Sequence, residues 1–228
     1  MTELPTPSLV WIKTQDGSPT LWNNSLGEPY RSVKGAFSES LFVFVKPALD
    51  YIRSKNLKEI SVGEFGLGAG TNWVFWCLAA HSLEIPFRYF AIEAHPIAFE
   101  EAKKKWNDEW AFLKKFLEDK LQINPKSLRF EDLENPQIFN SIDDAVSSGI
   151  QFDVWFHDPF AYSLNADGYS AETLNKCKNL WKKNFFACSY ACNKSFQNTL
   201  NSLEIPVVKS VDVGLATLKR ERLEFGNF

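Results

Sequence analysis

The sequence predicts a single α/β domain in which helices cover both faces of a mostly parallel sheet. Short apolar runs typical of strands alternate with longer segments of helical pattern along most of the chain. The first strand of this series runs into a glycine-rich turn that opens a helix, the arrangement of Rossmann-like folds. The chain has 228 residues and no break in composition, so we expect residues 1–57 to pack as an extension on a core of residues 58–228.

The N-terminal extension is predicted to contain a hairpin and a helix. The apolar residues 9–12 and the segment 20–22 flank an Asp-Gly turn, which favours two antiparallel strands. Residues 38–53 carry apolar side chains at the spacing of one helix face, although Pro47 interrupts the pattern. We expect this helix to be amphipathic and to lie beside the main sheet.

The core alternates between strands and helices and then ends on two strands. Strands are predicted over residues 59–62, 88–92, 128–130, 152–157 and 185–189. Helices are predicted over residues 71–80, 98–117, 136–147, 171–180 and 195–203. Residues 207–213 and 215–225 are predicted to form two strands with a turn near Gly214 and no helix between them, so we expect an antiparallel pair that closes the sheet.

Three alternate glycines, Gly66, Gly68 and Gly70, follow the first core strand and let the backbone approach a ligand closely. In the nicotinamide-binding pattern G-x-G-x-x-G the third glycine comes one residue later than it does here. The spacing therefore favours S-adenosylmethionine over NAD. Glu64, just before the loop, is expected to accept a hydrogen bond from the ammonium group of the cofactor.

Acidic residues are also expected at the ends of the next two strands. Glu93 ends the second core strand, some twenty residues after the glycine loop, where an acid can bind both ribose hydroxyls. Asp132 is expected to end the third strand and to receive the adenine amino group, although Glu131 is an equal neighbour. Together these positions predict the sheet of an S-adenosylmethionine-dependent methyltransferase.

The fourth strand ends in Asp158-Pro159-Phe160-Ala161, which places an acid and an aromatic residue at the edge where open α/β sheets bind ligands. This composition is typical of nitrogen methyltransferases, in which a carboxylate or carbonyl accepts the N–H of the methyl acceptor. Asp158 can also take the released proton, yet a carboxylate equally favours the ammonium form of a nearby amine. We therefore expect Asp158 to be the catalytic residue.

With these motifs in order, the chain resembles the bacterial tRNA wobble-uridine methyltransferases called MnmD and the methyltransferase half of the bifunctional protein MnmC. The family's strings D-G-S, G-E-x-Y-H-S, G-A-x-x-E-S, E-x-G-x-G-x-G and D-x-F-A are matched in this order by residues 16–18, 27–32, 35–40, 64–70 and 158–161. The match spans nearly the whole chain.

The resemblance implies methyl transfer from S-adenosylmethionine to the exocyclic amine of 5-aminomethyl-2-thiouridine in tRNA. It also implies that Asp158 lies beside this amine, and that Tyr30, Glu39 and Phe160 help to shape the acceptor pocket. Bifunctional members carry a flavin oxidase as well. Residues up to Phe228 show no second nucleotide-binding pattern, so we expect a standalone enzyme without flavin and a separate flavin-dependent oxidase upstream.

The chain departs from the family pattern at three places. Arg31 replaces the histidine of Y-H-S, residues 162–165 replace the usual proline and lysine, and Gln197-Asn198 stands where an arginine pair is expected. These departures leave two alternatives open. One is a methyltransferase of the same fold that acts on another nucleobase or a small amine, and the other is an inactive S-adenosylmethionine-binding module that binds RNA or a partner.

The bulk properties exclude several other classes of protein. A formal net charge of −3 argues against a surface that binds nucleic acid throughout, so any RNA contact needs a local patch. The basic residues in 219–222 are equally compatible with such a patch and with a solvated strand. The four cysteines and three histidines show no metal-site spacing, so we expect no metal. Neither a secretion signal nor a membrane-spanning run is present, and we place the protein in the cytoplasm.

Overall fold

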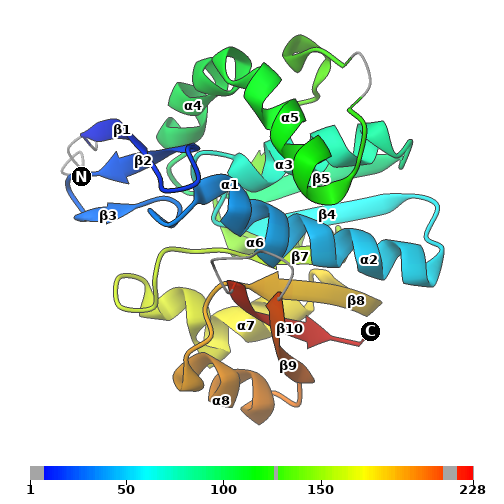
Figure 1. Ribbon diagram of the computed structural model, residues 1–228. Helices are drawn as coiled ribbons and strands as arrows, with labels where there is room; N and C mark the ends of the chain where they lie inside the picture. Colours follow the sequence, from blue (N-terminus) through cyan, green and yellow to red (C-terminus); the bar gives the residue numbers. More distant parts are fainter. Residues whose placement is uncertain (1–7, 126–127, 213–219, 228) are drawn as a thin grey trace.

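The computed structural model describes residues 8–125, 128–212 and 220–227, and its centre is a seven-stranded sheet (Figure 1). The strand order is β6 (Gln137–Phe139), β5 (Phe87–Ile92), β4 (Ile60–Phe65), β7 (Phe152–His157), β8 (Trp181–Ser189), β10 (Arg220–Gly226) and β9 (Val207–Asp212). The first five strands are parallel, whereas β10 is antiparallel to both β8 and β9. This confirms the predicted parallel sheet with an antiparallel closing pair. The predicted turn near Gly214 lies outside the described residues.

The order of the strands creates a crevice between β4 and β7. The chain starts in the middle of the sheet at β4, moves outward to β6, and then returns to β7 on the other side of β4. Connections that leave two adjacent parallel strands in opposite directions open a crevice at the carboxyl ends of those strands. Phe65 pairs with His157 in this position, so the glycine loop and the segment that begins at Asp158 start side by side.

Helices cover both faces of the sheet, as predicted. On one face lie α2 (Lys46–Lys55), α3 (Thr71–Ser82), α4 (Ile97–Asp108) and α5 (Trp110–Leu121). On the other lie α6 (Ile142–Ser147), α7 (Ala171–Lys178) and α8 (Lys194–Ser202). The helix predicted over residues 98–117 is in fact two helices, which meet at Glu109 after the polar pair Asn107-Asp108.

The third strand of the core lies nine residues later than predicted. Residues 130–132 form a single turn of 3-10 helix, η2 (Phe130–Asp132), and β6 lies inside the segment predicted as a helix. Three residues of β6 pair with β5, so the strand is fixed by its neighbour rather than by a long apolar run. The helix α6 begins only after Ser141, whose side chain accepts a hydrogen bond from the Asp144 amide.

The N-terminal extension contains a small sheet of β1 (Leu9–Lys13), β2 (Pro19–Asn23) and β3 (Glu28–Pro29). The predicted hairpin is confirmed by the pairing of β1 with β2, whereas β3 was not predicted. The predicted helix is present as α1 (Ala36–Glu39), a π-helical segment η1 (Ser40–Val45) and α2. All six residues of η1 are buried, so the expected amphipathic pattern is wrong there.

The break in the helical pattern at Pro47 has a structural counterpart. Proline lacks the amide hydrogen that an α-helix interior requires, and Pro47 occurs in the first turn of α2, directly after the wider π-helical turn. Phe44 of η1 packs edge-on against Phe156 of β7, with ring centroids 5.5 Å apart. The extension therefore contributes to the core of the domain.

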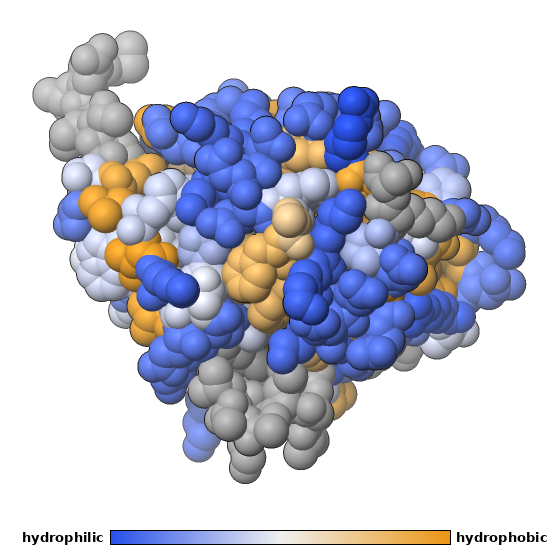
Figure 2. Space-filling model, turned by 45° about the horizontal axis from the view of Figure 1, so that its top comes forward, coloured by the Kyte–Doolittle hydropathy of each residue, from blue (hydrophilic) through white to orange (hydrophobic). Residues whose placement is uncertain are grey.

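The face shown in Figure 2 is mainly hydrophilic, with hydrophobic residues in small groups. Large apolar side chains that are exposed include Val10 and Val208, at 48% and 52%. No helix within the described residues is both long enough and apolar enough to cross a membrane.

Candidate functional site

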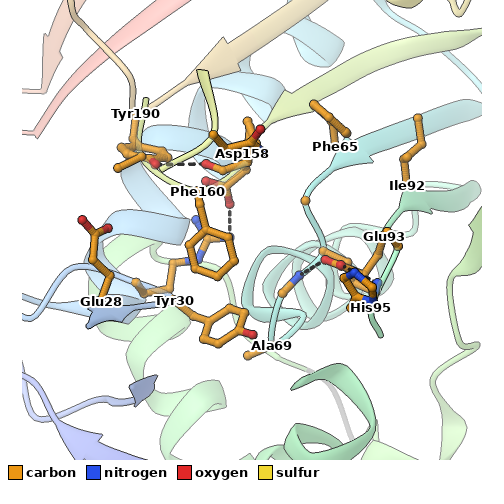
Figure 3. A pocket seen from close by; sticks show the side chains of 18 of the residues that line it. Glu28, Tyr30, Phe65, Ala69, Ile92, Glu93, His95, Asp158, Phe160 and Tyr190 are labelled. Carbon is orange, nitrogen blue, oxygen red and sulfur yellow. Dashed lines mark hydrogen bonds and ion pairs between the residues drawn. The ribbon is translucent and has the colours of Figure 1, made fainter. Parts of the chain in front are cut away.

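A cavity of about 690 Å³ opens at the carboxyl ends of β4, β5 and β7 (Figure 3). Ligand pockets in proteins commonly measure roughly 300–1,000 Å³. Loops that follow these three strands form much of the wall, and residues 28–32 of the N-terminal extension complete it. In Figure 3, Asp158, Phe160 and Tyr30 lie on one side, and Ile92 and Glu93 lie on the other.

The glycine loop adopts a backbone that requires glycine. Gly66, Gly68 and Gly70 have φ angles of +89°, +52° and +72°, in the left-handed region. A Cβ atom at Gly68 would lie 2.8 Å from the ring of Tyr30, and one at Gly70 would lie 2.7 Å from Phe99. Gly66 and Gly68 line the cavity, whereas Gly70 does not. The glycines therefore let the loop line the cavity with main-chain atoms, and they leave room for Tyr30 and Phe99 to pack closely against it.

Glu93 lies where the sequence predicts it, at the edge of the cavity beside the glycine loop. One carboxylate oxygen accepts a hydrogen bond from the Gly68 amide at 3.1 Å, and the other accepts one from the His95 amide at 3.0 Å. These bonds hold the carboxylate at the cavity edge.

Asp132 does not end the third strand, so that prediction is wrong. It lies in η2 on the surface, where its Oδ1 pairs with Arg129 Nη2 at 2.7 Å, and it does not line the cavity. The segment that follows β6 and lines the cavity consists of Asn140, Ser141 and Ile142. The misplacement of the strand therefore led to the wrong residue.

Glu64 lies behind the cavity rather than in its wall. Its side chain is fully buried, and it accepts hydrogen bonds from Asn72 Nδ2 at 2.7 Å and from the Tyr89 hydroxyl at 2.8 Å. Burial raises the pKa of Glu64 to about 8, Asp158 adds to this effect, and Arg31 opposes it. The structure does not support the expected contact between Glu64 and the cofactor ammonium group, because the fully buried carboxylate does not line the cavity.

Asp158 follows β7, lines the cavity and has a side chain only 4% exposed. Its amide donates to the Phe65 carbonyl at 2.9 Å, which fixes the backbone against the glycine loop. Arg31 Nη2 pairs with the Oδ2 atom of Asp158, and Asn72 Nδ2 donates to the same oxygen at 2.9 Å. Burial raises the pKa of Asp158 to about 7, while Arg31 acts to lower it.

Arg31 is a central residue of the site, although in the sequence it stands out only as a departure from a motif. It is 5% exposed, and its guanidinium lies 3.7 Å from Glu64 and 3.9 Å from Glu39 in addition to its contact with Asp158. Burial acts to lower the pKa of Arg31, but these three carboxylates outweigh it and raise that pKa. No signal in the sequence brings Arg31 and Asp158 together.

The departures from the family pattern do not all reach the cavity. Arg31 and Asn165 line it, whereas Tyr162 and Gln197 do not. Tyr162 accepts a hydrogen bond from Ser195 at 3.0 Å, and Gln197 donates to the Cys192 carbonyl at 2.9 Å. The changes at Tyr162 and Gln197 therefore act outside the cavity wall.

The Asp16-Gly17-Ser18 string caps the helix that carries Glu39. Ser18 Oγ accepts hydrogen bonds at 3.1 Å from the amides of Ala36 and Phe37, in the first turn of α1. Asp16 Oδ2 accepts another at 3.0 Å from the Ser38 amide. The first amides of a helix have no partner within the helix, so this loop supplies the missing acceptors and fixes the position of Glu39 in the cavity wall.

Aromatic residues complete the acceptor side of the cavity. The rings of Tyr30 and Phe160 lie 5.0 Å apart at an angle of 57°. The Pro159 carbonyl accepts hydrogen bonds from the hydroxyls of Tyr169 and Tyr190, at 3.1 Å and 3.0 Å. Tyr190 also lines the cavity and was missed in the sequence, because it lies after β8 without a recognisable motif.

His157, at the end of β7, supports the loop from the other face of the sheet. Its Nε2 donates to the Gly168 carbonyl at 3.0 Å, and its Nδ1 accepts from Trp155 Nε1 at 3.4 Å. Burial lowers the pKa of His157 to about 3, so the ring is neutral. Within the described residues, no group of three or more histidine, cysteine, aspartate and glutamate side chains is arranged to hold a metal ion.

Comparisons with known proteins agree with this geometry. The sequence model of a protein family described as "S-adenosyl-L-methionine-dependent methyltransferase" matches residues 98–224, more than half of the chain. Among solved structures, MnmC2 from Aquifex aeolicus superposes with a TM-score of 0.70 and 22% sequence identity, covering 97% of this chain and 71% of that chain. This similarity confirms the predicted fold.

Curated relatives point in the same direction. The tRNA 5-methylaminomethyl-2-thiouridine biosynthesis bifunctional protein MnmC of Campylobacter hominis is 24% identical over 83% of this chain and 29% of its own length. The protein of the same name from Campylobacter concisus is 28% identical over 76% of this chain and 29% of its own length. The chain thus spans under a third of the length of these relatives.

Proposed function

The chain belongs to this family of S-adenosyl-L-methionine-dependent methyltransferases, and we propose that it methylates the aminomethyl group of wobble 5-aminomethyl-2-thiouridine in tRNA. The observation that carries the proposal is that Asp158 and Glu93 line one continuous cavity. A carboxylate for the methyl acceptor and a carboxylate for the cofactor ribose thus share one space. We propose that residues 1–57 and 58–228 act as one catalytic domain, since Tyr30 and Glu39 of the extension also line this cavity.

The cofactor end of the cavity consists of Gly66, Gly68 and Glu93, with Gly70 shaping the turn behind them. Gly66 and Gly68 line the cavity with main-chain atoms, and the Glu93 carboxylate accepts a hydrogen bond from the Gly68 amide. This donor set suits the ribose of S-adenosylmethionine, because a carboxylate can accept hydrogen bonds from two adjacent hydroxyls. When bound, S-adenosylmethionine supplies an electrophilic methyl group.

The acceptor end of the cavity is acidic, which suits an amine. Glu28, Glu39 and Asp158 line it, and Arg31 is the cation next to them. The acceptor nitrogen must present its lone pair, so an ammonium group has to lose a proton before it reacts. Asp158 can accept an N–H hydrogen bond and hold the lone pair in line, and such positioning provides about 7–11 kcal/mol in favourable intramolecular cases.

The choice of tRNA as substrate is supported by the names of the Campylobacter relatives, which refer to biosynthesis of 5-methylaminomethyl-2-thiouridine in tRNA. The paired rings of Tyr30 and Phe160 at the cavity provide a surface on which a pyrimidine base can stack. We further propose that a flavin-dependent oxidase acts upstream and supplies the aminomethyl group.

The test is methylation of tRNA from cells that lack wobble methylation. The protein is incubated with labelled S-adenosylmethionine and this tRNA, and the digested nucleosides are identified by mass spectrometry. We expect labelled 5-methylaminomethyl-2-thiouridine, and no label when the same tRNA comes from cells with complete modification. Label on a different nucleoside, or only on small amines, would refute the proposed acceptor while leaving the methyltransferase assignment intact.

A further inference from the structure

Arg31 and Asn72 hold the Asp158 carboxylate by one of its two oxygens. Both side chains contact Oδ2, the guanidinium through an ion pair and the amide through a hydrogen bond of 2.9 Å. Within the described residues, no hydrogen bond reaches Oδ1. The carboxylate is thus fixed in orientation, and its second oxygen stays available in a side chain that lines the cavity.

Arg31 is itself held in place by the protein rather than by a ligand. Its amide donates to Thr20 Oγ1 of β2 at 3.1 Å, and its guanidinium lies 5.2 Å from the centre of the Phe44 ring. Contact with an aromatic face and with carboxylates suits the planar guanidinium, and a lysine ammonium cannot reproduce both contacts. Arg31 is therefore fixed before any acceptor enters.

The charges around Asp158 make its ion pair with Arg31 important. Glu39 from α1 and Glu64 from β4 are both carboxylates, and within the described residues Arg31 is the one cation within ion-pair distance of Asp158. The hydroxyls of Tyr169 and Tyr190 face the neighbouring Pro159 carbonyl and carry no charge at neutral pH, because burial raises the pKa of both. Without Arg31, burial and the neighbouring carboxylates would favour the protonated form of Asp158.

We propose that Arg31 is a positioning residue that fixes the Asp158 carboxylate through Oδ2 and so presents Oδ1, ionised, to the N–H of the methyl acceptor. The inference rests on the proposed amine methylation and adds a residue to it. An ionised carboxylate is only an acceptor of hydrogen bonds, whereas a protonated one can also donate to the nitrogen and occupy its lone pair. Arg31 thus determines whether Asp158 aims the acceptor or blocks it.

Three variants test the inference. Arg31→Gln removes the charge, Arg31→Lys keeps it, and Lys182→Gln is the matched control, because Lys182 pairs with Asp153 at the opposite end of β7 at 2.8 Å. Circular dichroism and thermal unfolding show which variants are folded. For each folded variant, kcat/KM toward the amine acceptor is measured between about pH 6 and pH 9, and S-adenosylmethionine affinity is measured by calorimetry.

We expect Arg31→Gln to lower kcat/KM by about 100-fold at neutral pH and to move the acidic limb of the profile upward by about one pH unit or more. Arg31→Lys should restore the acidic limb toward that of the wild type, and cofactor affinity should change little in either variant. Lys182→Gln should match the wild type throughout. An acidic limb that stays in place in folded Arg31→Gln, or that moves upward in Arg31→Lys as far as it does in Arg31→Gln, would overturn the inference.

A second measurement separates this inference from the proposed function. In protein labelled with ¹³C at aspartate carboxyl groups, the Asp158 signal is identified by its loss in Asp158→Asn, and its titration is compared between the wild type and the Arg31 variants. A higher titration midpoint in Arg31→Gln supports the inference even if the wild type methylates no amine, in which case the proposed function alone fails. An unchanged midpoint counts against the inference.

Discussion

Gly66 packs directly against the backbone of Asp158, so that a Cβ atom at Gly66 would collide with the Asp158 carbonyl oxygen. The Asp158 amide in turn donates to the Phe65 carbonyl at 2.9 Å. The loop proposed to bind the cofactor and the loop proposed to bind the acceptor are therefore in contact through main-chain atoms, which cannot move aside as a flexible side chain can.

The first prediction concerns this contact. Gly66→Ala should destabilise the protein and weaken S-adenosylmethionine binding, because the new methyl group collides with backbone in addition to requiring a left-handed conformation. Gly149→Ala is the matched control, since Gly149 also has a positive φ (+70°) but nothing lies within 4 Å of its added Cβ. The control should cost roughly 1–2 kcal/mol for the backbone alone, and Gly66→Ala about 1–3 kcal/mol more, by urea unfolding. Equal costs would contradict the contact.

The second prediction concerns Glu93. Glu93→Gln should raise the Kd for S-adenosylmethionine about 10- to 100-fold, because hydrogen bonds to a charged group contribute roughly 1.5–3 kcal/mol. Asp132→Asn should leave the Kd unchanged, since Asp132 pairs with Arg129 on the surface. Isothermal titration calorimetry measures both values. A large effect of Asp132→Asn would restore the adenine role that the structure argues against.

The third prediction concerns Asp158. Asp158→Asn keeps the size of the side chain but removes its charge, and Asp158→Ala removes both. Each should reduce kcat by at least about 100-fold while S-adenosylmethionine affinity stays within a few-fold. Steady-state assays with labelled cofactor measure kcat, and calorimetry measures affinity. Full activity in Asp158→Ala would remove the basis of the proposed acceptor site.

The fourth prediction concerns the cap of α1. Ser18→Ala leaves the amides of Ala36 and Phe37 without their acceptor and should lower the free energy of unfolding by about 1–2 kcal/mol. It should also reduce activity, because α1 carries Glu39. Ser25→Ala, at an exposed position in the same extension, is the control and should change neither quantity. An equal effect of the two substitutions would show that Ser18 does not act as a cap.

The fifth prediction concerns pH. Burial lowers the pKa of His157 to about 3 from an ordinary value of 6.5, so the unfolded chain takes up a proton below about pH 6.5 that the folded protein does not. The contribution of the neutral His157 ring to the free energy of unfolding is complete above about pH 6.5. It declines as the pH falls, by about 1.4 kcal/mol per pH unit. Between pH 7 and pH 5 the wild type should therefore lose about 2 kcal/mol more than His157→Gln.

Comparing the wild type with His157→Gln cancels the contributions of the other buried titratable groups to the pH dependence of stability. Burial raises the pKa of both Glu64 and Asp158, so their protonation favours the folded state as the pH falls, equally in both proteins. Urea unfolding at pH 5, 7 and 8 measures the difference. Parallel stability curves between about pH 5 and pH 7 would show that His157 is accessible to protons in the folded state.

The sequence predicted the parts of the fold that depend on local pattern. Strand β7 matches its predicted bounds, because an apolar run bounded by turns on both sides has one reasonable assignment. Glu93 was placed correctly because neighbouring parallel strands end at the same edge of the sheet. Strand β6 was missed because three residues paired with β5 leave too short a pattern to distinguish from the helix that follows.

The directions in which side chains point could not be predicted from the sequence either. Glu64 stands at the predicted place in the chain, but Tyr89 and Asn72 draw its carboxylate into the protein. Arg31 and Asp158 lie far apart in the sequence, and their contact depends on how the extension docks onto the sheet. Both outcomes depend on tertiary neighbours, which a single sequence does not reveal.

Because residues 40–45 form a π-helical turn, the orientation of Glu39 relative to α2 depends on the number of residues in this segment. A π turn contains about one residue more than an α turn, so a regular α-helix that kept all six residues would rotate Glu39 by about 100° relative to α2. Glu39 would then face away from Arg31 even though every side chain of the site was retained. Loss of one residue from the turn, by contrast, would convert it to α-helix with both flanking segments in register, so a relative that is one residue shorter here can keep its carboxylate aimed at the guanidinium.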